Sequence, residues 1–178
     1  MKLLERFRNQ PAWQSEDPSV RLDAVKSLPD GVDVDDVLLD VVLRDDDLRV
    51  RLAAVERMTD LERLVSLLKE ADVDDETRSA VASGVTALVV ELTDEAVADQ
   101  AIQALKDERS LGVVAKTAEN ESIGLAALQY VVTDRVLSAV ARNTKYVVVA
   151  LEAVRRMTDP AELTVVAVKA DDKATALA

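Results

Sequence analysis

The chain has 178 residues and a formal net charge of −12, and 49% of its residues are hydrophobic although only 2% are aromatic. It contains neither cysteine nor histidine, which excludes disulfides and thiolate metal sites and removes the commonest metal ligand and general base. A strongly negative chain repels nucleic-acid phosphates and anionic membrane surfaces, so we expect neither as a partner. Without a long apolar run or a signal-peptide pattern, the predicted location is the cytoplasm.

Residues 1–16 are predicted to form an N-terminal capping segment. Its large apolar side chains precede the first repeat and would close that repeat's exposed face: Leu3, Leu4, Phe7 and Trp13. A partner-binding or membrane-surface segment is the alternative interpretation.

From residue 17 to residue 178 the chain reads as an array of helix–turn–helix repeats. The phrase AVERMTD at 54–60 returns as AVRRMTD at 153–159. The first helix of each repeat carries apolar residues at helical spacing, which predicts one buried face. The clearest copies lie thirty residues apart and follow Asp17 and Asp47: Val20, Leu22, Ala24, Val25 and Leu28, then Val50, Leu52, Ala54, Val55 and Met58.

A second helix is predicted after each first helix. It has its own pattern, with Leu64, Leu67, Leu68 and Ala71 matching Leu111, Val114, Ala115 and Ala118 and then Leu163, Val166, Ala167 and Ala170. An aspartate precedes each second helix and is predicted to cap it: Asp30, Asp60, Asp107, Asp134 and Asp159. Pro160 would then occupy a first helical position. Neither helix can bury its apolar face alone, so neighbouring repeats must stack.

The stretch between Thr77 and Asp107 breaks this rhythm. It shows a first helix at 77–88, a turn at Thr93 and Asp94, and then another first helix, with no second helix between them. Either a repeat has lost one helix or the register differs there. Gly84 is predicted to permit a close helix approach.

The last eight residues, 171–178, align with 46–53 in the first helix of an earlier repeat. We therefore expect the array to be truncated within a further repeat. Such an end would expose Val165, Val168 and Leu177 and favour a homodimer.

The repeats DPSVRLDAVKSL and DDLRVRLAAVERMTD resemble HEAT-like repeats of the short bacterial, phycobilisome-lyase-associated type. The opening PAWQSEDPSVRLDAV is also similar to the N-terminal repeat region of larger bacterial proteins of unknown function. The resemblance implies an all-α superhelical solenoid, here of about five to six helical hairpins, whose concave surface binds proteins.

Two sets of cations occupy equivalent places in successive repeats. Arg21, Arg51 and Arg78 lie on first helices, where we expect a ladder of ion pairs with loop aspartates such as Asp17 and Asp47. Lys69, Lys116 and Arg142 lie near the ends of second helices, with Lys169 close to the series. These three cations either complement the helix C-termini or form a basic stripe that binds a partner through an acidic peptide or phosphates.

No catalytic, cofactor-binding or metal-binding residue is predicted. The aspartate clusters at 33–36 and 45–47 lack the glycine and glutamate of a calcium loop. The predicted function is a non-enzymatic scaffold for protein–protein interaction. A nucleic-acid-binding or DNA-repair helical-repeat protein and a tetrapyrrole lyase or chaperone are the alternatives, although the charge and the missing cysteine and histidine disfavour them.

Overall fold

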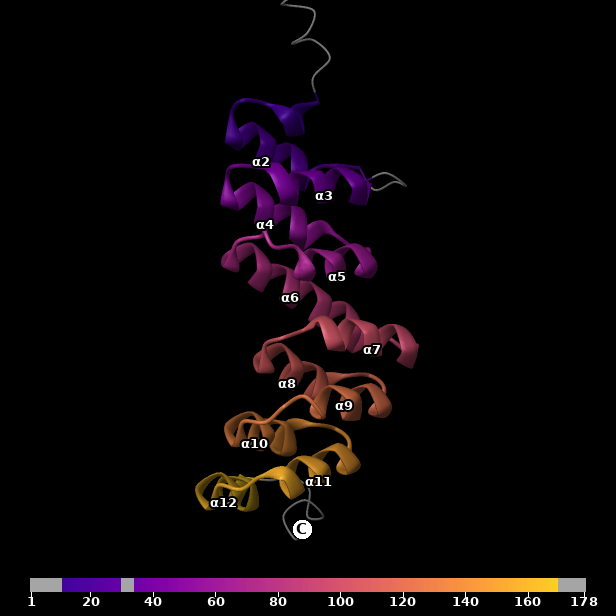
Figure 1. Cartoon of the computed structure of the whole chain (residues 1–178), viewed down its shortest axis with the longest axis vertical. Helices are drawn as coiled ribbons and strands as arrows, with labels where there is room; N and C mark the ends of the chain where they lie inside the picture. The colour runs from indigo at the N-terminus through magenta and orange to yellow at the C-terminus, as the bar shows by residue number, and fades with distance from the viewer. Residues whose placement is uncertain (1–10, 30–33, 170–178) are drawn as a thin grey trace, which may run out of the picture. The chain divides into compact units, whose positions relative to one another are not determined.

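The computed structural model describes residues 11–29 and 34–169, which form one 3-10 turn and eleven α-helices without a strand (Figure 1). The all-α prediction is confirmed. None of the described helices combines the length and apolar character needed to cross a membrane. The chain divides into two compact units, residues 1–84 and 85–178, and each is described by itself.

The first unit contains the turn η1 (Ala12–Gln14), the helices α2 (Pro18–Lys26), α3 (Val34–Arg44), α4 (Leu48–Arg57) and α5 (Leu61–Lys69), and the first part of α6 (Asp75–Glu91). Helix α2 packs against η1 and α4, and α3 packs against α4. The core consists of fully buried aliphatic residues, including Val25, Leu38, Val50, Leu64 and Leu67.

The structure describes only part of the predicted start of the array. Val20, which the pattern places on the buried face, is 43% exposed. Trp13 is half-buried within η1. The other residues of the predicted cap, Leu3, Leu4 and Phe7, lie outside the described residues.

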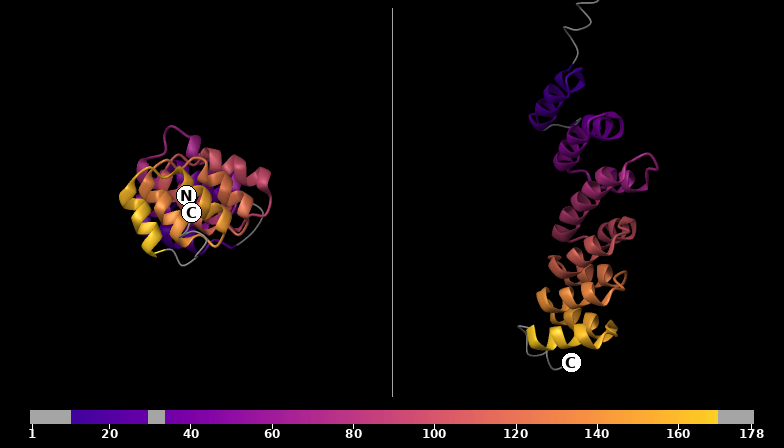
Figure 2. Two further views of the ribbon diagram at one scale, coloured as in Figure 1. Left: turned by 90° about the horizontal axis from the view of Figure 1, so that it is seen from below. Right: turned by 90° about the vertical axis from the view of Figure 1, so that its left-hand side faces the viewer.

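The second unit contains the rest of α6, then α7 (Glu95–Ala104), α8 (Glu108–Thr117), α9 (Glu121–Leu128), α10 (Asp134–Asn143), α11 (Val147–Arg156) and α12 (Pro160–Lys169). The first helices α7, α9 and α11 pack in one row and the second helices α8, α10 and α12 in another (Figures 1 and 2). The rows bury Ile102, Leu111, Ile123, Leu128 and Leu137.

The irregular stretch is one long helix followed directly by a first helix. α6 spans 17 residues, longer than the predicted 77–88, and α7 begins after Asp94, whose side chain accepts hydrogen bonds from the amides of Ala96 and Val97. No second helix lies between α6 and α7 in this described stretch.

Most of the predicted aspartate caps are present. Asp60 caps α5 and Asp107 caps α8, and Asp159 accepts from the amide of Ala161 at 2.9 Å. Pro160 is the first residue of α12, as predicted. The prediction for Asp134 is wrong, because the N-cap of α10 is Thr133. Asp30 lies outside the described residues.

The repeated phrase AV-x-RMTD holds each repeat to the one before it. Its arginine donates to backbone carbonyls at the end of the preceding first helix: Arg57 to Val25 (3.0 Å) and Lys26 (3.2 Å), Arg156 to Leu128, Gln129 (3.3 Å) and Val131 (2.6 Å). Each such arginine bonds carbonyls at a helix end, where intrahelical partners run out.

The threonine of the same phrase binds an acidic residue at the start of the preceding second helix. The amide and hydroxyl of Thr158 donate to Asp134 at 2.9 and 3.0 Å, and Thr59 binds Asp35 in the same way at 3.2 and 3.4 Å. The hydrogen bonds from the Thr158 backbone hold the pKa of Asp134 below its usual range. The methionine is buried in both copies. Packing and hydrogen bonding therefore account for the residues that the two copies of the phrase share.

The close helix approach occurs at a different glycine from the predicted one. A β-carbon on Gly84 would lie 3.6 Å from Leu64 Cδ1, which is an ordinary contact. A β-carbon on Gly112 would overlap the Cγ1 of Val136, so α8 and α10 approach closely there.

Candidate protein-binding surfaces

Arg21 of α2 forms the best-connected ion pair of the described chain. Its Nε and Nη2 donate to the two carboxylate oxygens of Asp45 at 2.8 Å each, and Nη2 also pairs with Asp46. Its Nη1 binds the carbonyls of Ser15 (3.0 Å) and Glu16 (3.2 Å). Burial of Asp45 opposes its ionisation, but the Arg21 guanidinium and the Asp47 amide together outweigh this, and the pKa of Asp45 lies below its usual value.

Arg51 and Arg78 bind different groups. Arg51 pairs with Asp74 at 3.1 Å and donates to the Asp45 carbonyl at 2.8 Å. Arg78 donates to the carbonyls of Leu68, Glu70 and Val73 at 2.7 to 2.8 Å. Arg21 and Arg51 therefore form the expected ion pairs, but with other aspartates than Asp17 and Asp47, whereas Arg78 bonds backbone carbonyls. Asp17 and Asp47 cap their own helices, and Arg21 and Arg51 reach aspartates one repeat further along the chain.

The arginine ladder does not continue into the second unit. The fourth residue after the N-cap is Arg21, Arg51 or Arg78 in the first unit, but Ala98, Gly124 or Ala150 in α7, α9 and α11. These small residues are buried, and a β-carbon on Gly124 would lie 3.3 Å from the Ala115 carbonyl oxygen. Because its cations have internal partners, the ladder has a structural role.

The predicted basic stripe lies in two parts. Lys69 ends α5 in the first unit, whereas Lys116 and Arg142 stand in the last turns of α8 and α10 in the second. Since α8 and α10 pack side by side in the same direction, Lys116 and Arg142 occupy matching places there. Arg142 donates to the Ser138 carbonyl of its own helix at 3.2 Å, and Lys116 forms no ion pair with a described residue. Both interpretations of the stripe, helix capping and partner binding, stay open.

The second unit also has an open apolar groove between α9 and α11, of about 520 Å³. Lys145 and Tyr146, before α11, bind Glu119, before α9, and the end of α11 binds the end of α9 through Arg156. The two helices are therefore parallel, and the groove runs along both. Its lining residues are Leu125, Leu128 and Gln129 of α9 and Val148, Leu151, Glu152, Arg155 and Arg156 of α11.

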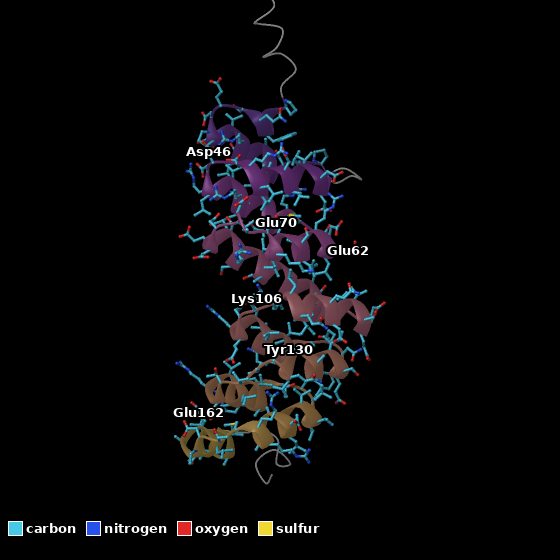
Figure 3. All side chains as sticks on the ribbon, in the orientation of Figure 1. Asp46, Glu62, Glu70, Lys106, Tyr130 and Glu162 are labelled. Carbon is cyan, nitrogen blue, oxygen red and sulfur yellow. The ribbon has the colours of Figure 1, made fainter. Side chains whose placement is uncertain are left out.

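The groove combines exposed apolar and cationic groups. Val148 is 51% exposed. The Arg155 side chain is 77% exposed, and its guanidinium lies as far as 3.7 Å from the carboxylate of Glu152. Beyond the end of α9 follow Tyr130, labelled in Figure 3, at 47% exposure and Val132 at 75%. Exposed apolar residues at such a concentration are typical of surfaces that bind another molecule.

The groove was not predicted from the sequence. Its leucines belong to the same helical pattern as buried core residues, and only the spacing of α9 and α11 leaves Leu125 and Leu151 half-exposed. The available signal was Val148, an apolar residue at a helix position that is Arg49 in α4 and Ser122 in α9.

Two further predicted features are partly described. Val168 is 77% exposed and Val165 half-buried on α12, while Leu177 lies outside the described residues; a homodimer through this end stays a prediction. Within residues 11–29 and 34–169, no cluster of acidic side chains is placed to hold a metal ion.

Comparisons with models of known protein families, with curated proteins and with solved structures find no match to this chain.

Proposed function

We propose that this chain is a non-enzymatic, HEAT-like scaffold of the cytoplasm that binds another protein. The observation that supports this most is the open groove between α9 and α11, where Val148 is 51% exposed and Leu125 and Leu151 are only half-buried. Apolar side chains in a groove lower their free energy when a partner covers them, by roughly 25 cal/mol per Å².

The resemblance to HEAT-like repeats supports the same function, since helical arrays of that kind present extended surfaces to protein partners. The described surface is dominated by ion pairs and helix caps whose members have partners within the chain, such as Arg21 with Asp45 and Arg51 with Asp74. The groove and the stripe of Lys116 and Arg142 are two surfaces of the described residues that a partner could cover.

Affinity capture from a lysate of the organism that makes the chain tests the proposal. The bait is compared with a groove variant, Val148→Asp with Leu151→Asp, and with a stripe variant, Lys69→Glu with Lys116→Glu and Arg142→Glu. We expect the wild type and the stripe variant to capture the same specific protein and the groove variant to lose it, while circular dichroism shows all three to be helical.

The opposite pattern, with loss in the stripe variant alone, would move the binding site to the ends of α8 and α10. Capture that neither variant changes, or no specific capture at all, would contradict a scaffold function for these surfaces.

A further inference from the structure

We infer that the groove between α9 and α11 binds an acidic amphipathic helix of a partner protein. This inference rests on the proposed function and adds the chemistry of the partner. Three features of the groove carry it: its apolar floor, the charge at one end, and the secondary structure of its walls.

The apolar floor is built by matching residues of the two helices. Leu125 and Leu151 are equivalent residues, five positions after the N-caps of α9 and α11. The equivalent residue of α7 is Asp99, so the floor does not extend across α7. Helices α2 and α4 have leucines at this position, Leu22 and Leu52. At the position of Val148, however, α4 has Arg49, whose guanidinium pairs with Asp47 at 2.6 Å, so an exposed valine at this position distinguishes the groove of α9 and α11 from the pair α2 and α4.

The charge of the groove is positive at the C-terminal end of its helices. The guanidinium of Arg156 donates to three backbone carbonyls and pairs with no carboxylate among the described residues. Arg155 is mostly exposed and its 3.7 Å contact with Glu152 is too long for a good hydrogen bond. Two cations thus face one carboxylate, and a partner carboxylate placed at Arg155 would gain a charge-assisted hydrogen bond.

The walls of the groove favour a helix over an extended strand. Beyond their first turns, α9 and α11 bond their backbone amides within the helix, and Asn120 accepts from the Ser122 amide at the start of α9. They therefore offer no free edge for an added strand, whereas an amphipathic helix needs only apolar contacts spaced by three or four residues. Val148 is exposed and Leu125 and Leu151 are half-buried, so these three side chains offer the apolar surface for such contacts.

The sequence itself supplies a matched variant for the test. Arg155→Glu converts AVRRMTD at 153–159 into AVERMTD, the heptapeptide that already folds at 54–60. The substitution keeps Arg156, Met157 and Thr158, which hold the repeats together. The reciprocal variant Glu56→Arg places AVRRMTD in the first unit, where Glu56 is exposed. Both variants should fold as the wild type does.

The probe is a fluorescein-labelled amphipathic helical peptide of about 18 residues, with leucines along one face and glutamates elsewhere, and a second peptide in which lysines replace the glutamates. Fluorescence anisotropy at physiological salt measures binding of the full chain to each. We expect the wild type to bind the acidic peptide and Arg155→Glu to weaken that binding by about tenfold. Val148→Ser, which introduces the residue found at this position in α9, should weaken it as well.

Glu56→Arg separates a groove from a general charge effect. If the acidic peptide responds only to net charge, this variant will strengthen binding as much as Arg155→Glu weakens it, and the inference fails. It also fails if Arg155→Glu binds as the wild type does, if the lysine peptide binds equally well, or if neither peptide binds. Should the peptides fail while lysate capture still requires Val148 and Leu151, the scaffold function stands and only the partner's chemistry is overturned.

Discussion

Thr158 and Asp159 link two repeats through the carboxylate of Asp134. The hydroxyl of Thr158 donates to Asp134 at 3.0 Å, and the neighbouring amides of Thr158 and Asp159 donate to the same carboxylate at 2.9 Å each. The three bonds join the turn before α12 to the start of α10. In a repeat array, each repeat packs only against its neighbours. Hydrogen bonds between two repeats therefore contribute to stability even where they are exposed.

Thr158→Val should lower the free energy of unfolding by about 1 kcal/mol, since it removes the hydroxyl and keeps the β-branched shape. Urea titration followed by circular dichroism measures the change. Thr164→Val is the matched control, because its hydroxyl binds only the Pro160 carbonyl of the same helix at 2.8 Å. An equal loss in both variants would show that the contact between repeats adds nothing.

Helix pairs within the two units differ in how closely they approach, as the space at their glycines shows. Gly112 of α8 faces Val136 of α10, whereas Gly84 of α6 has ordinary contacts with Leu64. A β-carbon at the first position requires the valine or the helix to move, while at the second it fills available space.

Gly112→Ala should therefore destabilise the chain by about 1 to 3 kcal/mol, and Gly84→Ala should stabilise it by about 1 kcal/mol because alanine is the better helix former. Thermal unfolding of both variants measures the two signs. Adding Val136→Ala to the first variant should recover part of its loss. A Gly112→Ala protein as stable as the wild type would contradict a close approach of α8 and α10.

Periodicity made the helices and many of their caps predictable, because both depend on residues close in sequence. Asp60, Asp107 and Pro160 lie within four residues of the groups that they serve. The partners of Arg21 and Thr158 were not predictable in this way, since Asp45 and Asp134 lie 24 residues away in a neighbouring repeat.

The groove and the contact at Gly112 escaped prediction for the same reason. Both depend on the distance between two helices, which repeat patterns leave open. Leu125 and Leu151 read as core residues in the sequence, and their partial exposure follows from how α9 and α11 pack.

At the scale of the whole molecule, acidity is the dominant property. The net charge is −12, yet several carboxylates hold their charge through local hydrogen bonds. The Arg49 side chain lowers the pKa of Asp47 to about 2, and the Thr77 hydroxyl and amide lower that of Asp74 to about 2, from an ordinary value of 3.8. These carboxylates favour the folded state only while they are ionised.

Between pH 4 and pH 2, the unfolded chain takes up protons that the folded chain does not, so acid should favour unfolding. We expect the melting temperature to fall over this interval, and to fall less steeply in Asp74→Asn, which has one such carboxylate fewer. Asp72→Asn, an exposed residue of the same loop without a described hydrogen bond, should retain the wild-type slope. Identical slopes in all three proteins would contradict the assignment to Asp74.

The backward direction of the AV-x-RMTD contacts has a consequence for synthesis. Arg57 reaches a carbonyl 32 residues earlier, and Arg156 reaches one 28 residues earlier. During translation, a newly emerged first helix therefore keeps open carbonyls at its end until about one more repeat has left the ribosome. Folding should lag behind the ribosome by that length, and a stalled chain would leave its most recent repeat without its final hydrogen bonds.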